Sequence, residues 1–142
     1  MSTYKLFASD EGLEVNGIQL DLGAAGQFTI ARAGGSNQNF ARRFQKASQP
    51  YRRAIAANAM DETEANRILA QVYAETIVRG WEGVSGPDGK PLQYSIPNCV
   101  KLLTDLPELF AEIRRVSADS SVFRKNVVEA EAGNSQPASG TP

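Results

Sequence analysis

The chain has 142 residues, of which 42% are hydrophobic and 22% are charged, values typical of one ordinary soluble domain. It has no histidine and one cysteine, Cys99, so a single chain can form neither a disulfide, nor a zinc site of the Cys/His type, nor a Cys-His or Ser-His catalytic pair. We therefore expect no enzymatic activity, no catalytic residues, no metal and no cofactor.

The charge is distributed unevenly. The net charge is −1, yet residues 34–59 carry five basic and no acidic side chains. The first residues lack the basic region and apolar run of a signal peptide, and no run of about 18 apolar residues occurs. These features predict a cytoplasmic protein that does not insert into a membrane.

Three short strands are predicted within residues 11–32. Asn16-Gly17 is a dipeptide that favours a two-residue hairpin turn, and apolar residues alternate on both sides of it: Leu13, Val15, Ile18, Leu20 and Leu22. Such a turn would set Val15 opposite Ile18 and Leu13 opposite Leu20. Phe28 and Ile30 predict a third strand, which would complete a small antiparallel meander.

Helical spacing begins in the basic segment. Ser36 is the expected N-cap, and the apolar stripe consists of Phe40, Phe44, Ala47, Tyr51 and Ile55. Because Pro50 lacks a backbone donor and clashes with the preceding turn, we expect a helix, a kink near Ser48-Gln49 and a second helix.

The clearest helix begins at Asp61, which with Glu64 resembles a capping box. Its apolar stripe is Ala65, Ile68, Leu69, Val72, Tyr73, Thr76, Ile77 and Trp81, and the next glycines, Gly80 and Gly83, are expected to end it. The sequence GPDGK at residues 86–90 predicts a turn, and Val84, Leu92 and Tyr94 are expected to flank it as a short hairpin.

Two further helices are predicted before the chain becomes polar. Ser95 would cap the first, with Pro97 in its first turn, and Asp105 would start the second, whose stripe ends at Val116. Phe123 is expected to dock on the core, and residues 125–142 to form a flexible, disordered tail.

The predicted fold class is therefore α+β and mainly α. A single folded domain, residues 1–124, would comprise a small N-terminal antiparallel β-meander at about 11–32 packed on a bundle of about four to five helices at about 37–118.

The first candidate site is the basic segment itself, with Arg42, Arg43, Lys46, Arg52 and Arg53. On an unbroken helix, Arg42, Lys46 and Arg53 would share one face. This face has three interpretations: a solvated surface, a protein-binding surface, or a nucleic-acid site with aromatic stacking. Against nucleic acid, the chain is slightly acidic overall and the aromatics keep the spacing of a core stripe.

The second candidate site is the loop after Trp81, with Val84 and Tyr94. Trp81 is interpreted first as a half-buried anchor whose indole N–H bonds to the loop that follows, and second as part of a partner-binding rim. Other chemistry is weakly represented. The carboxylates near Asp61 are explained by helix capping, GPDGK does not have the spacing of a P-loop, and Cys99 is interpreted as a core residue.

The order of several motifs carries a family resemblance: GLEVNGIQLDL, FTIARAGGSNQNF, YRR, VRGWEGV ahead of DGKPLQYS, and LLTDLPELFAEI ahead of SADSSVF. Over about residues 10–124, the chain resembles the tail assembly chaperones of long, non-contractile-tailed bacteriophages and related prophages. The resemblance implies a non-enzymatic protein of the host cytoplasm, absent from the mature virion, that keeps the tape measure protein soluble while the tail tube forms.

The resemblance also implies that some members have a longer form, made by ribosomal frameshifting, that contacts the tail tube protein. This chain would then be the short product or a member without an extension, and self-association stays open. Two other functions are kept as alternatives: a structural minor tail or tail completion protein, and a nucleic-acid-binding regulator that uses the basic face.

Overall fold

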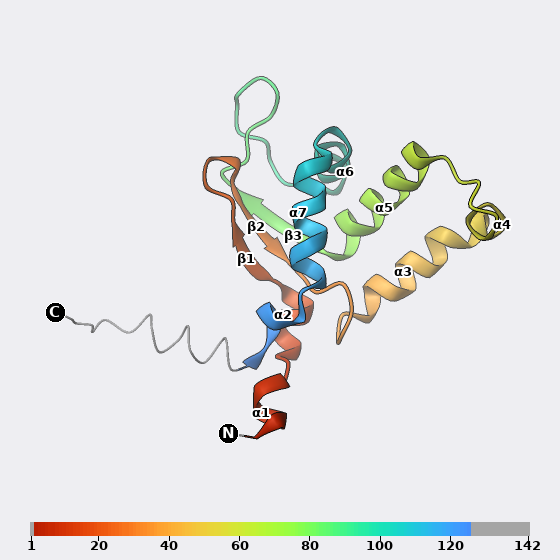
Figure 1. Ribbon diagram of the computed structural model, residues 1–142. Helices are drawn as coiled ribbons and strands as arrows, with labels where there is room; N and C mark the ends of the chain where they lie inside the picture. The colour runs from red at the N-terminus through yellow and green to blue at the C-terminus, as the bar shows by residue number, and fades with distance from the viewer. Residues whose placement is uncertain (1, 126–142) are drawn as a thin grey trace.

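A computed structural model describes residues 2–125 and confirms the mainly helical α+β fold class (Figure 1). Its helices are α1 (Thr3–Phe7), α2 (Glu11–Asn16), α3 (Gln38–Ser48), α4 (Arg52–Ala56), α5 (Glu62–Thr76), α6 (Ile96–Asp105) and α7 (Pro107–Ala118). Its strands are β1 (Ile18–Asp21), β2 (Gln27–Ile30) and β3 (Val78–Glu82). The predicted tail lies, from residue 126, outside the described residues.

The three strands form one antiparallel sheet in the order β1-β2-β3. Leu20 pairs with Phe28, which pairs in turn with Trp81. The first two strands are joined by a tight turn around a short 3-10 helix at Gly23–Ala25, not at Asn16-Gly17. Two of the three expected strands therefore lie where the sequence predicts them, but the remaining strand of the sheet is β3, from much later in the chain.

The predicted hairpin at Asn16-Gly17 is wrong because residues 11–16 form α2. The Asp10 carboxylate accepts the Leu13 N–H at 3.0 Å and caps this helix. Gly17 then ends it with a φ of 105°, and a Cβ there would lie 2.8 Å from Thr29 and 3.0 Å from the Ile30 backbone. The glycine is needed for this close approach to β2, and not for a hairpin turn.

Trp81 does not continue α5, as its spacing predicted, but lies on β3. The helix ends at Thr76, and the next residues, Ile77 and Val78, are β-branched and favour extended backbone. The exposed edge of β2 supplies hydrogen-bond partners for this segment, and Ala31 N–H also donates to the Ile77 carbonyl at 2.8 Å. Pairing with β2 thus overrides the helical spacing of apolar residues, which continues in the sequence for about one turn beyond the end of α5.

Of the predicted helix starts, two are confirmed and two are wrong. Asp61 accepts the Glu64 N–H at 3.1 Å, and Ser95 accepts the Asn98 N–H at 3.1 Å. The N-cap of α3 is Asn37 instead of Ser36, and that of α7 is Leu106 instead of Asp105. Asp105 pairs with a lysine of its own helix at 2.7 Å, so its carboxylate is not available as a cap.

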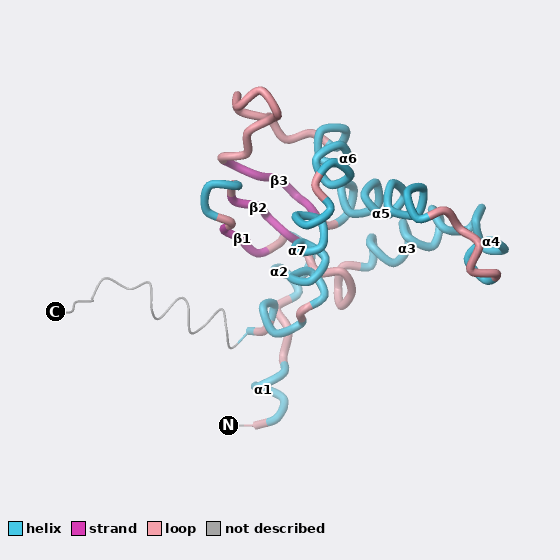
Figure 2. Tube along the Cα trace, turned by 45° about the horizontal axis from the view of Figure 1, so that its top comes forward, coloured by secondary structure: helices cyan, strands magenta, loops and turns pink. Residues whose placement is uncertain are grey.

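The core is organised around α5, which packs against α3, α6 and the sheet (Figure 2). Tyr73 of α5 lies edge-on between Phe40 and Phe110, with ring centroids 5.5 and 5.3 Å away. Cys99 is completely buried, as predicted. Phe123 is also completely buried, which confirms that the segment after α7 docks on the core.

Candidate functional site

The basic arm, defined as residues 38–56, extends from the sheet beside α5 (Figures 1 and 2). It consists of α3, a 3-10 turn at Gln49–Tyr51 that contains Pro50, and α4, so the predicted kink is confirmed. Within α3, Phe40 faces Tyr73 of α5, while Phe44 lies outside that contact, 6.0 Å from Phe40. Phe40 therefore anchors the start of α3 in the core, while Phe44, one turn later, stays 45% exposed.

Two polar contacts fasten the arm to α5. Arg43 donates from Nε and Nη2 to the two carboxylate oxygens of Glu75, each at 3.1 Å, which is the paired geometry of guanidinium and carboxylate. The Tyr51 hydroxyl donates to Glu64 at 3.0 Å. The Arg43 hydrogen bonds lower the pKa of Glu75, and the Glu64 contact raises the pKa of Tyr51. Arg43 is thus engaged within the molecule.

The other four cations of the arm have no carboxylate partner among the ion pairs of the described residues: Arg42, Lys46, Arg52 and Arg53. Arg42 donates to the side chain of Asn39 at 2.6 Å, which leaves its charge unbalanced. A surplus of positive charge on an arm that protrudes is suited to an acidic partner.

The kink determines which cations of the basic arm lie close together. Arg42, Lys46 and Arg52 line one shallow hollow of about 260 Å³, together with glutamines of the same arm, whereas Arg53 does not line it. An unbroken helix would have aligned Arg53 with Arg42, but the 3-10 turn changes the angular phase of α4 relative to α3. The structure therefore brings together three of the predicted cations and places Arg53 elsewhere on α4.

Large apolar side chains on the arm are also exposed. Phe44 is 45% exposed and Ile55 is 50% exposed, although both belong to the stripe that the sequence assigned to the core. Of the arm's apolar stripe, Phe40 packs against the core, whereas Phe44 and Ile55 do not belong to it. The basic arm consequently offers apolar contact area beside unpaired positive charge, a combination found at protein-binding surfaces.

The loop that follows β3 is a structural corner. The Trp81 indole N–H donates to the Leu92 carbonyl at 2.8 Å, and its ring packs edge-on against Phe28 and Tyr94 at 5.9 and 5.1 Å. The Tyr94 hydroxyl donates to the carbonyl of Val78 at 2.7 Å, and burial raises the pKa of Tyr94. Trp81 and Tyr94 therefore make these polar and aromatic contacts within the molecule.

Val84, the third candidate in this loop, is only 5% exposed. Its carbonyl accepts the Leu92 N–H at 2.8 Å, and a bridge between Ser85 and Pro91 closes the predicted short hairpin. The exposed part of the loop is therefore its tip around Asp88, where no candidate was assigned. The geometry matches the structural interpretation of Trp81, Val84 and Tyr94.

Sequence reasoning missed one exposed apolar element, the helix α1. Tyr4 is 88% exposed and Phe7 is 62% exposed, and the Arg124 guanidinium lies 4.5 Å from the Phe7 ring. In the sequence, this helix was indicated by the spacing of Tyr4 and Phe7 and by Ser2 as its N-cap. In the structure, the Ser2 hydroxyl accepts the Lys5 N–H.

Within residues 2–125, no cluster of three histidine, cysteine or acidic side chains could hold a metal ion. Burial raises the pKa of the Cys99 thiol to about 12, so it is not poised as a nucleophile. None of the described helices combines the length and apolar character needed to cross a membrane.

Comparison with known proteins gives one family. A model of the family described as YdaY prophage protein matches residues 35–134, well over half of the chain. The match begins just before α3 and includes the basic arm, α5, β3, α6 and α7, but not β1 and β2. No curated protein and no solved structure matches the chain.

Proposed function

Because this chain belongs to the YdaY prophage protein family, we propose that it is a non-enzymatic tail assembly chaperone that keeps the tape measure protein soluble in the host cytoplasm. Membership of a prophage protein family agrees with the part of this proposal that assigns the chain to a prophage. The assignment as a tail assembly chaperone is supported by the motif order that resembles such chaperones and by the surface of the basic arm.

The observation that carries the proposal is the exposed basic arm. Its unpaired cations, Arg42, Lys46 and Arg52, line one hollow, and Phe44 and Ile55 expose apolar area on the same arm. A long partner helix with an apolar stripe and acidic flanks fits such a surface, since apolar contacts supply affinity and charge supplies orientation. A chaperone that only holds its partner needs this kind of surface and no reactive group.

The test is co-expression with the long helical protein encoded downstream of this chain. The proposal expects a soluble complex with several copies of the chaperone, and a partner that precipitates when expressed alone. A partner that stays soluble alone and does not co-purify would contradict the proposal. Mass spectrometry of purified virions then tests the alternative, because a minor tail or completion protein would be present in them and a chaperone would be absent.

A matched pair of variants tests the surface. The triple variant Arg42→Gln, Lys46→Gln, Arg52→Gln removes three positive charges from the arm. Its control, Lys5→Gln, Arg79→Gln, Lys90→Gln, removes three exposed charges that lie outside the arm. Loss of the complex with the first variant alone supports recognition by the arm, and equal loss with both would show that only net charge matters.

Nucleic acid is the other possible acidic ligand of the arm. Binding of DNA or RNA that weakens steeply as salt rises would favour the regulator alternative. The chaperone proposal expects no such binding at low salt, and one titration with a labelled duplex decides between the two.

A further inference from the structure

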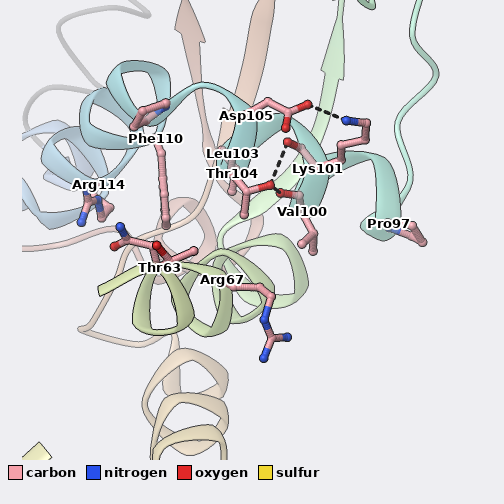
Figure 3. A pocket seen from close by; sticks show the side chains of 12 residues that line it. Thr63, Arg67, Pro97, Val100, Lys101, Leu103, Thr104, Asp105, Phe110 and Arg114 are labelled. Atoms are coloured by element: carbon pink, nitrogen blue, oxygen red, sulfur yellow. Dashed lines mark hydrogen bonds and ion pairs between the residues drawn. The ribbon is translucent and has the colours of Figure 1, made fainter. Parts of the chain in front are cut away.

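A second cleft lies between α5, α6 and α7 (Figure 3). It has a volume of about 590 Å³ and shares no lining residue with the hollows of the arm. Its inner wall includes two buried side chains, Leu103 and Phe110, while Thr63 of α5 lies on the opposite side. Figure 3 shows Phe110 extending from α7 toward Thr63, with Arg114 beside it.

Arg114 is the unusual residue of this cleft. Its guanidinium carbon lies 4.5 Å from the centre of the Phe110 ring, so the charged plane rests on an aromatic surface. Its Nε is buried and has no hydrogen-bond partner within the part of the chain that the structure describes. Arginine keeps its charge at any physiological pH, and a buried donor without a partner is destabilising. Arg114 also lines the cleft, so an anionic ligand bound there would meet its positive charge.

The other cations of the cleft are already neutralised. Arg67 pairs with Glu64 at 3.7 Å, and Lys101 pairs with Asp105 at 2.7 Å. No ion pair of the described residues includes Arg114. The cleft thus combines an apolar wall with one pre-oriented, uncompensated guanidinium.

We propose that this cleft binds an acidic amphipathic helix of a partner protein, with a carboxylate on Arg114 and the adjacent apolar side chain against Phe110 and Leu103. Charge complementarity selects the carboxylate, and guanidinium can bind it through two parallel hydrogen bonds. The groove between helices selects the shape of the partner. Because its residues differ from those of the basic arm, this site stands whether or not the arm binds the tape measure protein.

The test uses the full chain and a fluorescein-labelled synthetic peptide with leucines on one helical face and glutamates beside them. Fluorescence anisotropy measures its affinity for the wild type, for Arg114→Gln and for Arg115→Gln. Arg115 is the matched control, since it is the next residue, carries the same charge and pairs with Glu112 outside the cleft. We expect roughly tenfold weaker binding for Arg114→Gln, a change within about twofold for Arg115→Gln, and roughly tenfold weaker binding of the peptide with glutamine in place of glutamate.

Nuclear magnetic resonance locates the peptide. Binding in the cleft should shift the backbone signals of Thr63, Val100 and Arg114, whereas shifts confined to the basic arm would overturn the proposal. Equal losses for Arg114→Gln and Arg115→Gln would also overturn it. If Arg114→Gln fails to fold, Thr63→Trp provides the second variant, because this exposed residue can fill the cleft from α5, and unchanged affinity in that variant would refute the site.

Discussion

The indole N–H of Trp81 donates to the carbonyl of Leu92 at 2.8 Å, which ties β3 to the far side of the loop at 83–91. Replacing Trp81 with phenylalanine keeps an aromatic ring and removes this donor. We expect the free energy of unfolding to fall by about 1–2 kcal/mol for Trp81→Phe, and by about 3 kcal/mol or more for Trp81→Ala, which also removes the packing on Phe28.

Urea denaturation followed by circular dichroism measures both values, since the chain has no second tryptophan for fluorescence. The same variants test the recognition interpretation of this loop. If Trp81→Ala stays folded and binds the partner as the wild type does, Trp81 has no role in recognition.

Stability should depend on pH through a buried carboxylate, Glu14. Its side chain is 2% exposed, pairs with Arg32 and accepts the Ser36 N–H at 3.0 Å. Burial acts to raise the pKa of Glu14, but these hydrogen bonds outweigh it, so its pKa lies below the ordinary 4.5. Because the folded pKa is lowered, its stabilising contribution is present above pH 4.5 and is lost as the pH falls through the folded pKa.

Glu14→Gln tests this assignment in unfolding titrations between pH 7 and pH 3. We expect a loss of about 2 kcal/mol at pH 7 and a smaller decrease of stability toward low pH than in the wild type. Glu11→Gln, on the exposed side of the same helix, is the control and should leave the pH dependence unchanged. Parallel pH curves for the wild type and Glu14→Gln would show that Glu14 does not titrate with folding.

The contact between Arg43 and Glu75 should couple the basic arm to α5. Both side chains remain about one-third exposed, so solvent weakens the attraction. A double-mutant cycle with alanine at both positions should give a coupling energy of about 0.5–1 kcal/mol, which decreases in 1 M salt. A coupling near zero at low salt would mean that the arm is held by Phe40 and Tyr51 alone.

The thiol of Cys99 should be inert in the folded protein. It is completely buried, and its raised pKa of about 12 leaves almost no thiolate at pH 8. We expect Ellman's reagent to modify it rapidly in denaturant and, in buffer, only at the slow rate set by global unfolding. Rapid modification of the folded chain would mean that α6 opens locally.

The candidate site was predictable in its composition but not in its geometry. A run of cations without acids between residues 34 and 59 is visible in the sequence, and Pro50 predicts the kink. The partner of Arg43 was not predictable, because Glu75 lies on another helix. Nor was the meeting of Arg52 with Arg42, because it depends on the turn between their helices.

By itself, the sequence determined the features that depend on neighbours along the chain. These are the helical stripes, the caps at Asp61 and Ser95, the kink at Pro50 and the absence of histidine chemistry. Local spacing is enough for these features because hydrogen bonds within a helix join residues four apart.

Only the tertiary structure decided the features that depend on distant partners. Asn16-Gly17 ends a helix because Gly17 must approach β2, and residues 78–82 form a strand because the edge of β2 is available to them. In both places the same local pattern is compatible with two backbone conformations. The hydrogen bonds and buried area gained from the rest of the fold select one of them.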